Sequence, residues 1–167
     1  MKNLYIMCGV GFSGKSTLAK KITEYKNAVL VSQDNIWFEK EKEWDLDESS
    51  DEDWDRVLKI SKQKVKDELA KGNSVVFDHI NTKHSHREEL RNIAKEFNAQ
   101  AIVIYLDTPT DIQKKRQIKN IKTKEHHYVK QEFLDEAIEE LEIPQETENV
   151  FVFRPETDIE SWLNKLP

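Results

Sequence analysis

The chain has 167 residues, of which 35% are charged and 37% hydrophobic, and its formal net charge is −6 at pH 7. This length predicts one domain, spanning residues 1–167, with a full core, and the negative charge argues against a general nucleic-acid binder. The single cysteine, Cys8, excludes an intrachain disulfide. No apolar run approaches the roughly 18 residues of a membrane helix. The first apolar stretch leads directly into a glycine loop, without the features of a signal peptide, so we expect a cytoplasmic protein with no membrane partner.

The glycine-rich segment Gly9–Thr17 follows an apolar stretch and precedes a helical pattern, and it contains three of the four glycines. Two motifs fit it. Gly9, Gly11 and Gly14 satisfy the dinucleotide pattern G-x-G-x-x-G, with Asp34 near the position of the ribose-binding acid. The same segment satisfies the P-loop pattern, G-x-x-x-x-G-K-S.

The residues after the last glycine favour the P-loop. A nucleoside triphosphate needs a ring of backbone N–H groups, a cation at the β- and γ-phosphates and a hydroxyl for Mg²⁺, and Lys15 and Ser16 supply the last two. A dinucleotide has no special need for this lysine. The dinucleotide site and a purely structural turn are the weaker alternatives. The residues expected to bind ATP are Gly9, Gly11, Phe12, Ser13, Gly14, Lys15, Ser16 and Thr17.

Apolar runs alternate with helical patterns along the rest of the chain. After the run before the glycine loop, further buried strands are predicted at residues 28–31, 74–77, 101–106 and 149–153. The clearest helical patterns cover residues 54–69, 90–97, 109–121, 129–141 and 159–166. Continuous apolar strands between amphipathic helices predict a five-stranded parallel sheet in a three-layer α/β/α sandwich. Ligands bind at the carboxyl ends of such strands.

Two segments have an unusual charge. Residues 39–55 contain ten acidic residues and two lysines, and their apolar residues follow no convincing strand or helix period. We therefore expect a mobile loop or irregular helical insertion in this segment, within an acceptor-side insertion over about residues 35–60. Residues 114–130 contain seven basic residues, which favours a mobile lid over the phosphates rather than a merely solvated helix face. The lid residues expected to contact the nucleotide are Arg116, Lys122 and Lys124.

Two aspartates follow predicted strands at the edge where ligands bind. Asp78 is predicted to hold Mg²⁺ together with Ser16, and Asp34 to orient the acceptor hydroxyl and take its proton. A capping or turn role is the alternative for each. The neighbouring His126 and His127 suggest a metal site only weakly, because no third ligand stands at a matching spacing.

The order of these parts resembles the P-loop kinase branch that contains polynucleotide 5′-hydroxyl kinases, zeta-toxin-like kinases and chloramphenicol phosphotransferase. The matching segments are Gly9–Thr17, Ser32-Gln33-Asp34, Phe77–Asn81 followed by Arg87, and Leu106–Pro109 with Arg116. The resemblance implies a P-loop NTPase fold with sheet order 2-3-1-4-5. It also implies that Asn81 and Arg87 belong to the acceptor site with Asp34 and Asp78.

The sequence departs from this family on the acceptor side. Relatives usually carry an arginine shortly after the acceptor aspartate, where this chain has Trp37 and Phe38. Together with the acidic residues 39–55, this disfavours polynucleotide acceptors. We place Trp37 in the acceptor site and adenine near Arg154. An apolar stripe on a helix looks the same in the sequence whether it packs on the core of the domain or on a second subunit, so no oligomeric state is predicted.

These features together predict an ATP- and Mg²⁺-dependent kinase acting on a hydroxyl of a small molecule, with Lys15, Asp34 and Arg116 as its catalytic residues. One alternative is a polynucleotide 5′-hydroxyl or nucleotide kinase. The alternative from another class is an ATP-binding switch or interaction module with slow ATPase activity.

Overall fold

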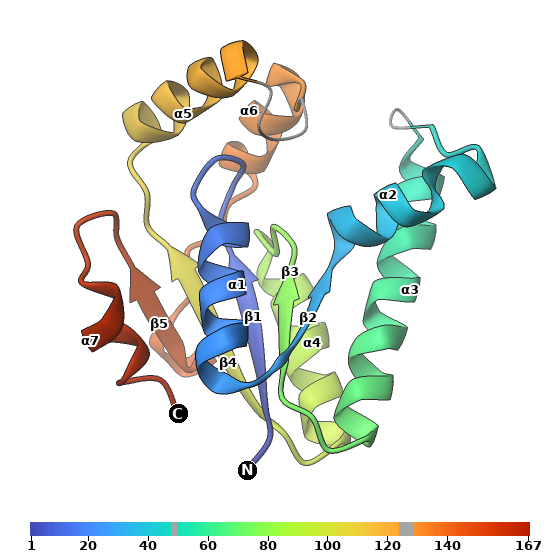
Figure 1. Cartoon of the computed structure of the whole chain (residues 1–167), viewed down its shortest axis with the longest axis vertical. Helices are drawn as coiled ribbons and strands as arrows, with labels where there is room; N and C mark the ends of the chain where they lie inside the picture. The colour runs from blue at the N-terminus through green and yellow to red at the C-terminus, as the bar shows by residue number, and fades with distance from the viewer. Residues whose placement is uncertain (48–49, 124–128) are drawn as a thin grey trace.

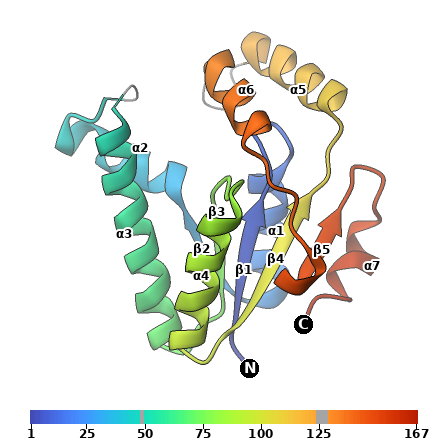
Figure 2. The same ribbon diagram turned by 180° about the vertical axis from the view of Figure 1, so that it is seen from behind.

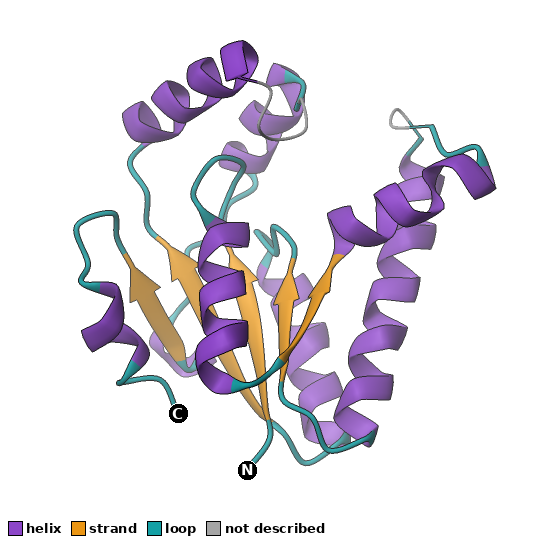
Figure 3. Ribbon diagram, viewed as in Figure 1, coloured by secondary structure: helices purple, strands orange, loops and turns teal. Residues whose placement is uncertain are grey.

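The computed structural model describes residues 1–47, 50–123 and 129–167. Within these residues, a central sheet is surrounded by helices (Figures 1 and 3). The strands are β1 (Asn3–Cys8), β2 (Val29–Ser32), β3 (Val75–Asp78), β4 (Gln100–Leu106) and β5 (Val150–Phe153). The helices are α1 (Lys15–Lys26), α2 (Gln33–Trp44), α3 (Asp51–Ala70), α4 (His84–Glu96), α5 (Thr110–Thr123), α6 (Gln131–Glu139) and α7 (Ile159–Leu163), with a 3₁₀ turn η1 (Glu146–Glu148).

The sheet is parallel throughout, and its strand order is β2-β3-β1-β4-β5. Strand β1 lies in the centre, where Leu4 pairs with Val75 on one side and with Ala101 on the other. The predicted three-layer α/β/α sandwich and the order 2-3-1-4-5 are therefore confirmed. Because all strands run the same way, their carboxyl ends share one edge, and ligands bind outside that edge in sheets of this kind.

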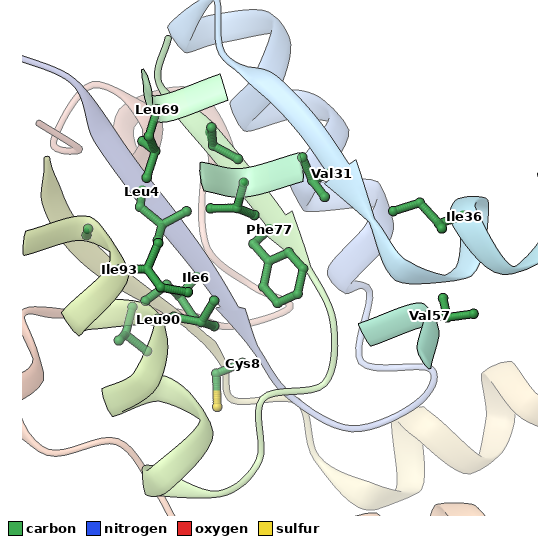
Figure 4. Close-up of a cluster of buried hydrophobic side chains, with 14 of the residues drawn as sticks. Leu4, Ile6, Cys8, Val31, Ile36, Val57, Leu69, Phe77, Leu90 and Ile93 are labelled. Atoms are coloured by element: carbon green, nitrogen blue, oxygen red, sulfur yellow. The ribbon is translucent and has the colours of Figure 1, made fainter. Parts of the chain in front are cut away.

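Helices cover both faces of the sheet, which explains why β1 reads as a continuous apolar run. Helices α3 and α4 cover one face and α1 and α7 the other (Figures 1 and 2). Successive β1 side chains alternate between the faces, so Leu4, Ile6 and Cys8 enter one cluster and Tyr5 and Met7 the other. Figure 4 shows the first cluster, in which Leu4, Ile6 and Cys8 of β1 gather with Leu69, Phe77, Leu90 and Ile93, while Val57 lies beside Ile36 at its other end.

Helices α5 and α6 lie over the carboxyl ends of the strands, beside the loop that joins β1 to α1 (Figures 1 and 2). Helix α5 packs loosely, since Asn120 is its one buried residue and Ile118 and Ile121 are 54% and 56% exposed. Among the described residues, no helix has the length and apolar character needed to cross a membrane.

The acidic segment 39–55 is more regular than expected. Helix α2 continues to Trp44, and α3 begins at Asp51, so the expectation of a loop or irregular insertion is wrong for most of this segment. Serine side chains cap both helices: Ser32 accepts from the Asn35 N–H at 3.4 Å, and Ser50 accepts from the Asp53 N–H at 3.2 Å. These caps supply helix starts that the weak apolar period did not reveal.

Trp37 belongs to the core rather than to an open acceptor site, which corrects the prediction. Its side chain is 1% exposed and stacks on Trp54 from α3, with ring centroids 3.8 Å apart. Its indole N–H finds no hydrogen-bond partner among the described residues. The aromatic pair therefore joins α2 to α3, and Trp37 contributes packing.

Replacing Trp37 with phenylalanine should lower the free energy of unfolding by only about 1–2 kcal/mol. The smaller ring loses contact with Trp54, but the substitution also removes the buried N–H that has no partner among the described residues, and this offsets part of the loss. Urea unfolding measures the change. The KM for the acceptor should stay the same, and a large increase in that KM would return Trp37 to the acceptor site.

Candidate active site

The loop between β1 and α1 is shaped to hold an anion. Gly14 occupies the N-cap of α1 in the left-handed region, with φ 101°, and Phe12 also has a positive φ of 59°. No side chain of the described residues caps α1, and its first turn contains no acidic residue. An uncapped helix N-terminus presents free N–H groups and a partial positive charge. The residues present therefore fit the phosphates of ATP.

Three polar side chains open the helix that follows this loop. The Lys15 ammonium donates to the Val10 carbonyl at 2.9 Å, which holds it against the loop. Burial lowers the pKa of Lys15, and the nearby carboxylates of Asp78 and Asp34 oppose that shift. Ser16 and Thr17 are exposed on the first turn. The loop thus combines backbone donors, a cation and two hydroxyls.

Asp34 and Asp78 lie at the ends of neighbouring strands. Ser32 at the end of β2 pairs with Asp78 at the end of β3, and Asp34 follows two residues later in the first turn of α2. Asp78 is 5% exposed, whereas Asp34 is exposed. Since both carboxylates act on Lys15, the fold brings three of the predicted site residues together. With the Ser16 hydroxyl, Asp78 offers the oxygen ligands that Mg²⁺ prefers.

Arg116 reaches the P-loop from α5, but it binds the loop itself. Its Nη1 donates to the carbonyls of Phe12 at 3.1 Å and Ser13 at 2.9 Å. The Thr108 hydroxyl donates to the same Ser13 carbonyl at 2.9 Å. The middle of α5 and the residues just before this helix are therefore attached to the loop by side-chain donors, and Thr108 is a contact that sequence reasoning missed.

The other predicted nucleotide contacts lie farther from the loop or outside the described residues. Lys122 is exposed in the last turn of α5. Lys124, His126 and His127 lie outside the described residues. Arg154 follows β5, and its Nε donates to Asp107 Oδ2 at 2.9 Å, which connects the ends of β4 and β5.

Arg87 and Asn81 are buried, which corrects their assignment to the acceptor site. The Arg87 side chain is 0% exposed and forms a two-pronged pair with Glu148, at 2.7 Å and 3.1 Å. Asn81 is 1% exposed and donates to the Met7 carbonyl at 2.8 Å. Both side chains are buried and donate to acceptors of the protein itself, which indicates a structural role.

The pairing with Arg87 should make folding sensitive to acid through Glu148. Burial alone would raise the pKa of Glu148, but hydrogen bonds from Arg87 and the Gln145 N–H lower it from 4.5 to about 2. Because the pKa of Glu148 is lower in the folded than in the unfolded state, the pair stabilises the fold fully at pH values above 4.5. This stabilisation is lost as the pH falls from 4.5 towards about 2.

Replacing Glu148 with glutamine should therefore reduce stability at neutral pH and flatten the loss of stability over that acidic range. Urea unfolding at a series of pH values measures this. The matched control is Glu146→Gln, an exposed position in the same turn. If Glu148→Gln and the wild type lost stability with the same pH slope, the coupling would be refuted.

Helix α6 packs against the tip of the P-loop at Gly11. A methyl group on Gly11 would come within 2.3 Å of Leu134 Cδ2, so the loop and α6 touch where no side chain intervenes. The contacting atom is the end of a flexible side chain, and a small shift of α6 can relieve the clash. The contact between Gly11 and Leu134 therefore determines how closely α6 approaches the loop.

Replacing Gly11 with alanine should cost only about 1 kcal/mol, the low end for an overpacked contact, while displacing α6 from the loop. Amide hydrogen exchange should become faster in residues 131–139. Adding Leu134→Val removes the obstructing methyl groups and should slow the exchange again. Unchanged exchange in Gly11→Ala would contradict the contact.

His79 is a further site residue that sequence reasoning did not assign. It directly follows Asp78, and burial, then the positive charge of Lys15, lowers its pKa to about 3. The imidazole is therefore neutral near pH 7 and can donate one hydrogen bond and accept another. In the sequence, the only sign that His79 lies near the candidate site is its position shortly after a predicted strand.

Together the fold and this loop are those of a P-loop α/β protein. The sequence pattern of the AAA domain family matches residues 4–144. The chain therefore belongs to the AAA domain family.

Solved structures with this fold include several kinases. A candidate kinase from Chloroflexus aurantiacus aligns with a TM-score of 0.79 at 15% identity, covering 98% of this chain and 92% of that one. A sugar kinase from Janibacter sp. aligns with a TM-score of 0.71 at 18% identity, covering 99% and 92%. The APS kinase of Mycobacterium tuberculosis, solved with AMPPNP and APS, aligns with a TM-score of 0.67 at 18% identity, covering 98% and 94%.

Proposed function

We propose that this chain is an ATP- and Mg²⁺-dependent kinase that transfers the γ-phosphoryl group to a hydroxyl of a small molecule. One observation carries the proposal: the P-loop lysine, Lys15, lies within electrostatic reach of two strand-end carboxylates, Asp34 and Asp78. A phosphate loop facing two acids provides the parts of phosphoryl transfer, whereas a loop that only binds nucleotide needs no second, exposed acid.

Each group has a separate role in this proposal. The N–H groups of residues 11–16 bind the phosphates, and Lys15 balances charge at the β- and γ-phosphates. Ser16 and Asp78 hold Mg²⁺, which when bound neutralises charge on the phosphates. Asp34, which is exposed, orients the acceptor hydroxyl and takes its proton. Arg116 sits at the loop and, with lysines of α5, adds positive charge above the phosphates.

The charges on the acceptor side support a small acceptor over a nucleic acid. Arg87 is buried with Glu148, and Arg56 lies over the Trp44 ring at 3.8 Å. The arm formed by α2 and the start of α3 is rich in carboxylates, which repel a phosphate backbone. The sugar kinase and the APS kinase that share this fold are named for small-molecule acceptors.

The test is transfer of label from γ-labelled ATP, with Mg²⁺, to two sets of acceptors. One set contains 5′-hydroxyl oligonucleotides, and the other contains nucleosides, sugars and hydroxylated antibiotics. We expect label in the second set alone. Label in the oligonucleotides would show a polynucleotide kinase. ATP binding with slow hydrolysis and label in neither set would show a nucleotide-dependent switch.

A further inference from the structure

A buried ion pair lies behind the candidate active site. Arg87 from α4 and Glu148 from η1 are both 0% exposed, and they are joined through Nε and Nη2 of the guanidinium at 2.7 Å and 3.1 Å. The two residues are 61 positions apart in the chain. The pair therefore connects a helix on one face of the sheet with the turn that leads into β5.

The guanidinium also holds the loop that follows β3. Its Nη1 donates to the Thr82 carbonyl at 2.7 Å and to the Asn81 carbonyl at 3.1 Å. Asn81 has a φ of 43°, in the left-handed region that asparagine adopts more readily than most residues, and contacts from outside the loop hold it in place. Arg87 provides two of these contacts.

The same loop holds the base of the P-loop. The Gly9 N–H donates to the Ile80 carbonyl at 3.0 Å, and the Asn81 amide donates to the Met7 carbonyl at 2.8 Å. Asp78 and His79 are at the other end of this loop. Hydrogen bonds at both ends of residues 80–82, joined by the backbone of this loop, therefore connect Glu148 and Arg87 to the first glycine of the phosphate loop.

Stability alone does not explain a fully buried ion pair. Removing two charges from water is costly, and well-packed apolar residues often replace such pairs without loss of stability. The planar fork of arginine fixes directions that a lysine or an apolar residue does not. We propose that Arg87 and Glu148 are positioning residues, which fix Asp78 relative to the P-loop through residues 79–82. The proposal rests on the proposed kinase function for its kinetic consequence.

The experiment compares Arg87→Lys with the double variant Arg87→Met/Glu148→Leu. The lysine keeps the charge but loses the fork, and the double variant removes both charges. The matched control is Arg91→Lys, one turn along α4, where Arg91 pairs with Glu88 and donates to the Thr147 carbonyl of η1 at 3.0 Å but makes no bond to residues 80–82 among the contacts of the described residues. For each protein we would measure thermal unfolding, kcat and KM for ATP, and hydrogen exchange at the Gly9 amide.

We expect both Arg87 variants to lose about 10- to 100-fold in kcat, because a misplacement of about 1 Å that a distant substitution causes at a reacting site can cost about 100-fold. The KM for ATP should change less, and exchange at Gly9 should become faster. The double variant should show these losses even where its thermal unfolding matches the wild type, and Arg91→Lys should show none. A stable double variant with wild-type kcat and wild-type exchange at Gly9 would overturn the proposal.

A second variant covers the case in which the Arg87 substitutions fail to fold. Asn81→Gly suits the positive φ and removes the side-chain bonds to the Met7 and His79 carbonyls, and it should also lower kcat and speed exchange at Gly9. Wild-type values for this variant would likewise count against the proposal. If the wild-type protein transfers no phosphoryl group, the proposed function fails, while exchange at Gly9 and Mg²⁺-dependent ATP affinity still test the positioning role.

Discussion

Replacing Lys15 with methionine should lower the rate of phosphoryl transfer by about 10²- to 10³-fold. The ammonium lies against the Val10 carbonyl, at the end of the loop that faces Asp34 and Asp78. Methionine has a similar length but cannot balance the charge that develops on the phosphates. The loss should fall mainly on kcat, measured as single-turnover transfer of label, because the backbone N–H groups of the loop still bind the nucleotide.

The folded state should tolerate this change. The substitution removes one hydrogen bond, and it also removes a partly buried charge whose desolvation opposes folding. The matched control is Lys21→Met, an exposed position on the same helix, which should leave both rate and stability unchanged. Wild-type transfer by Lys15→Met would show that the loop does not act as a catalytic phosphate site.

Replacing Asp34 with asparagine should lower transfer by about 10²- to 10⁴-fold, the range of a lost general base. The affinity for ATP should be retained, because Asp34 extends from the first turn of α2 and not from the P-loop. Asparagine keeps the shape and a hydrogen-bonding oxygen but cannot take a proton at neutral pH. Equilibrium binding of ATP and transfer of label, measured on one preparation, separate the two effects.

This variant also separates the two classes of function. A kinase should lose transfer, whereas a switch with slow ATPase activity should change little. The control is Asp55→Asn, an exposed acid on α3, which should behave like the wild type. If Asp34→Asn keeps full transfer activity, the proton acceptor is another group, and the neutral imidazole of His79 is the first to examine.

Local patterns predicted most of the fold. The apolar runs of β1 and β4, the glycine loop and the stripe of α3 each carry their signal within a few consecutive residues, and all were placed correctly. The strand-end positions of Asp34 and Asp78 followed from the rule that parallel strands share one carboxyl edge. The strand order came from the family resemblance, because periodicity does not specify which strands are neighbours.

Predictions that depended on distant partners failed. Arg87 has the sequence features of an exposed cation, and only Glu148, 61 residues later, makes its burial possible. Trp37 looks like an aromatic residue of an acidic surface segment, but the ring of Trp54 covers it. Helix α2 has a weak apolar period because its buried residues, Gln33, Ile36 and Trp37, all lie in its first half, so its cap and its packing on α3 determine its structure.

The central place of β1 has a consequence for synthesis of the protein. Both neighbours of β1 come much later in the chain, since Leu4 pairs with Val75 and with Ala101. During translation, the apolar segment that leads into the P-loop is made well before β3 and β4, and it can be enclosed only after both have been made. Non-local pairing of this kind slows folding and leaves apolar surface exposed in the meantime. The phosphate loop is thus synthesised before the two strands that enclose the strand leading into it, and that strand can complete its pairing only after both are made.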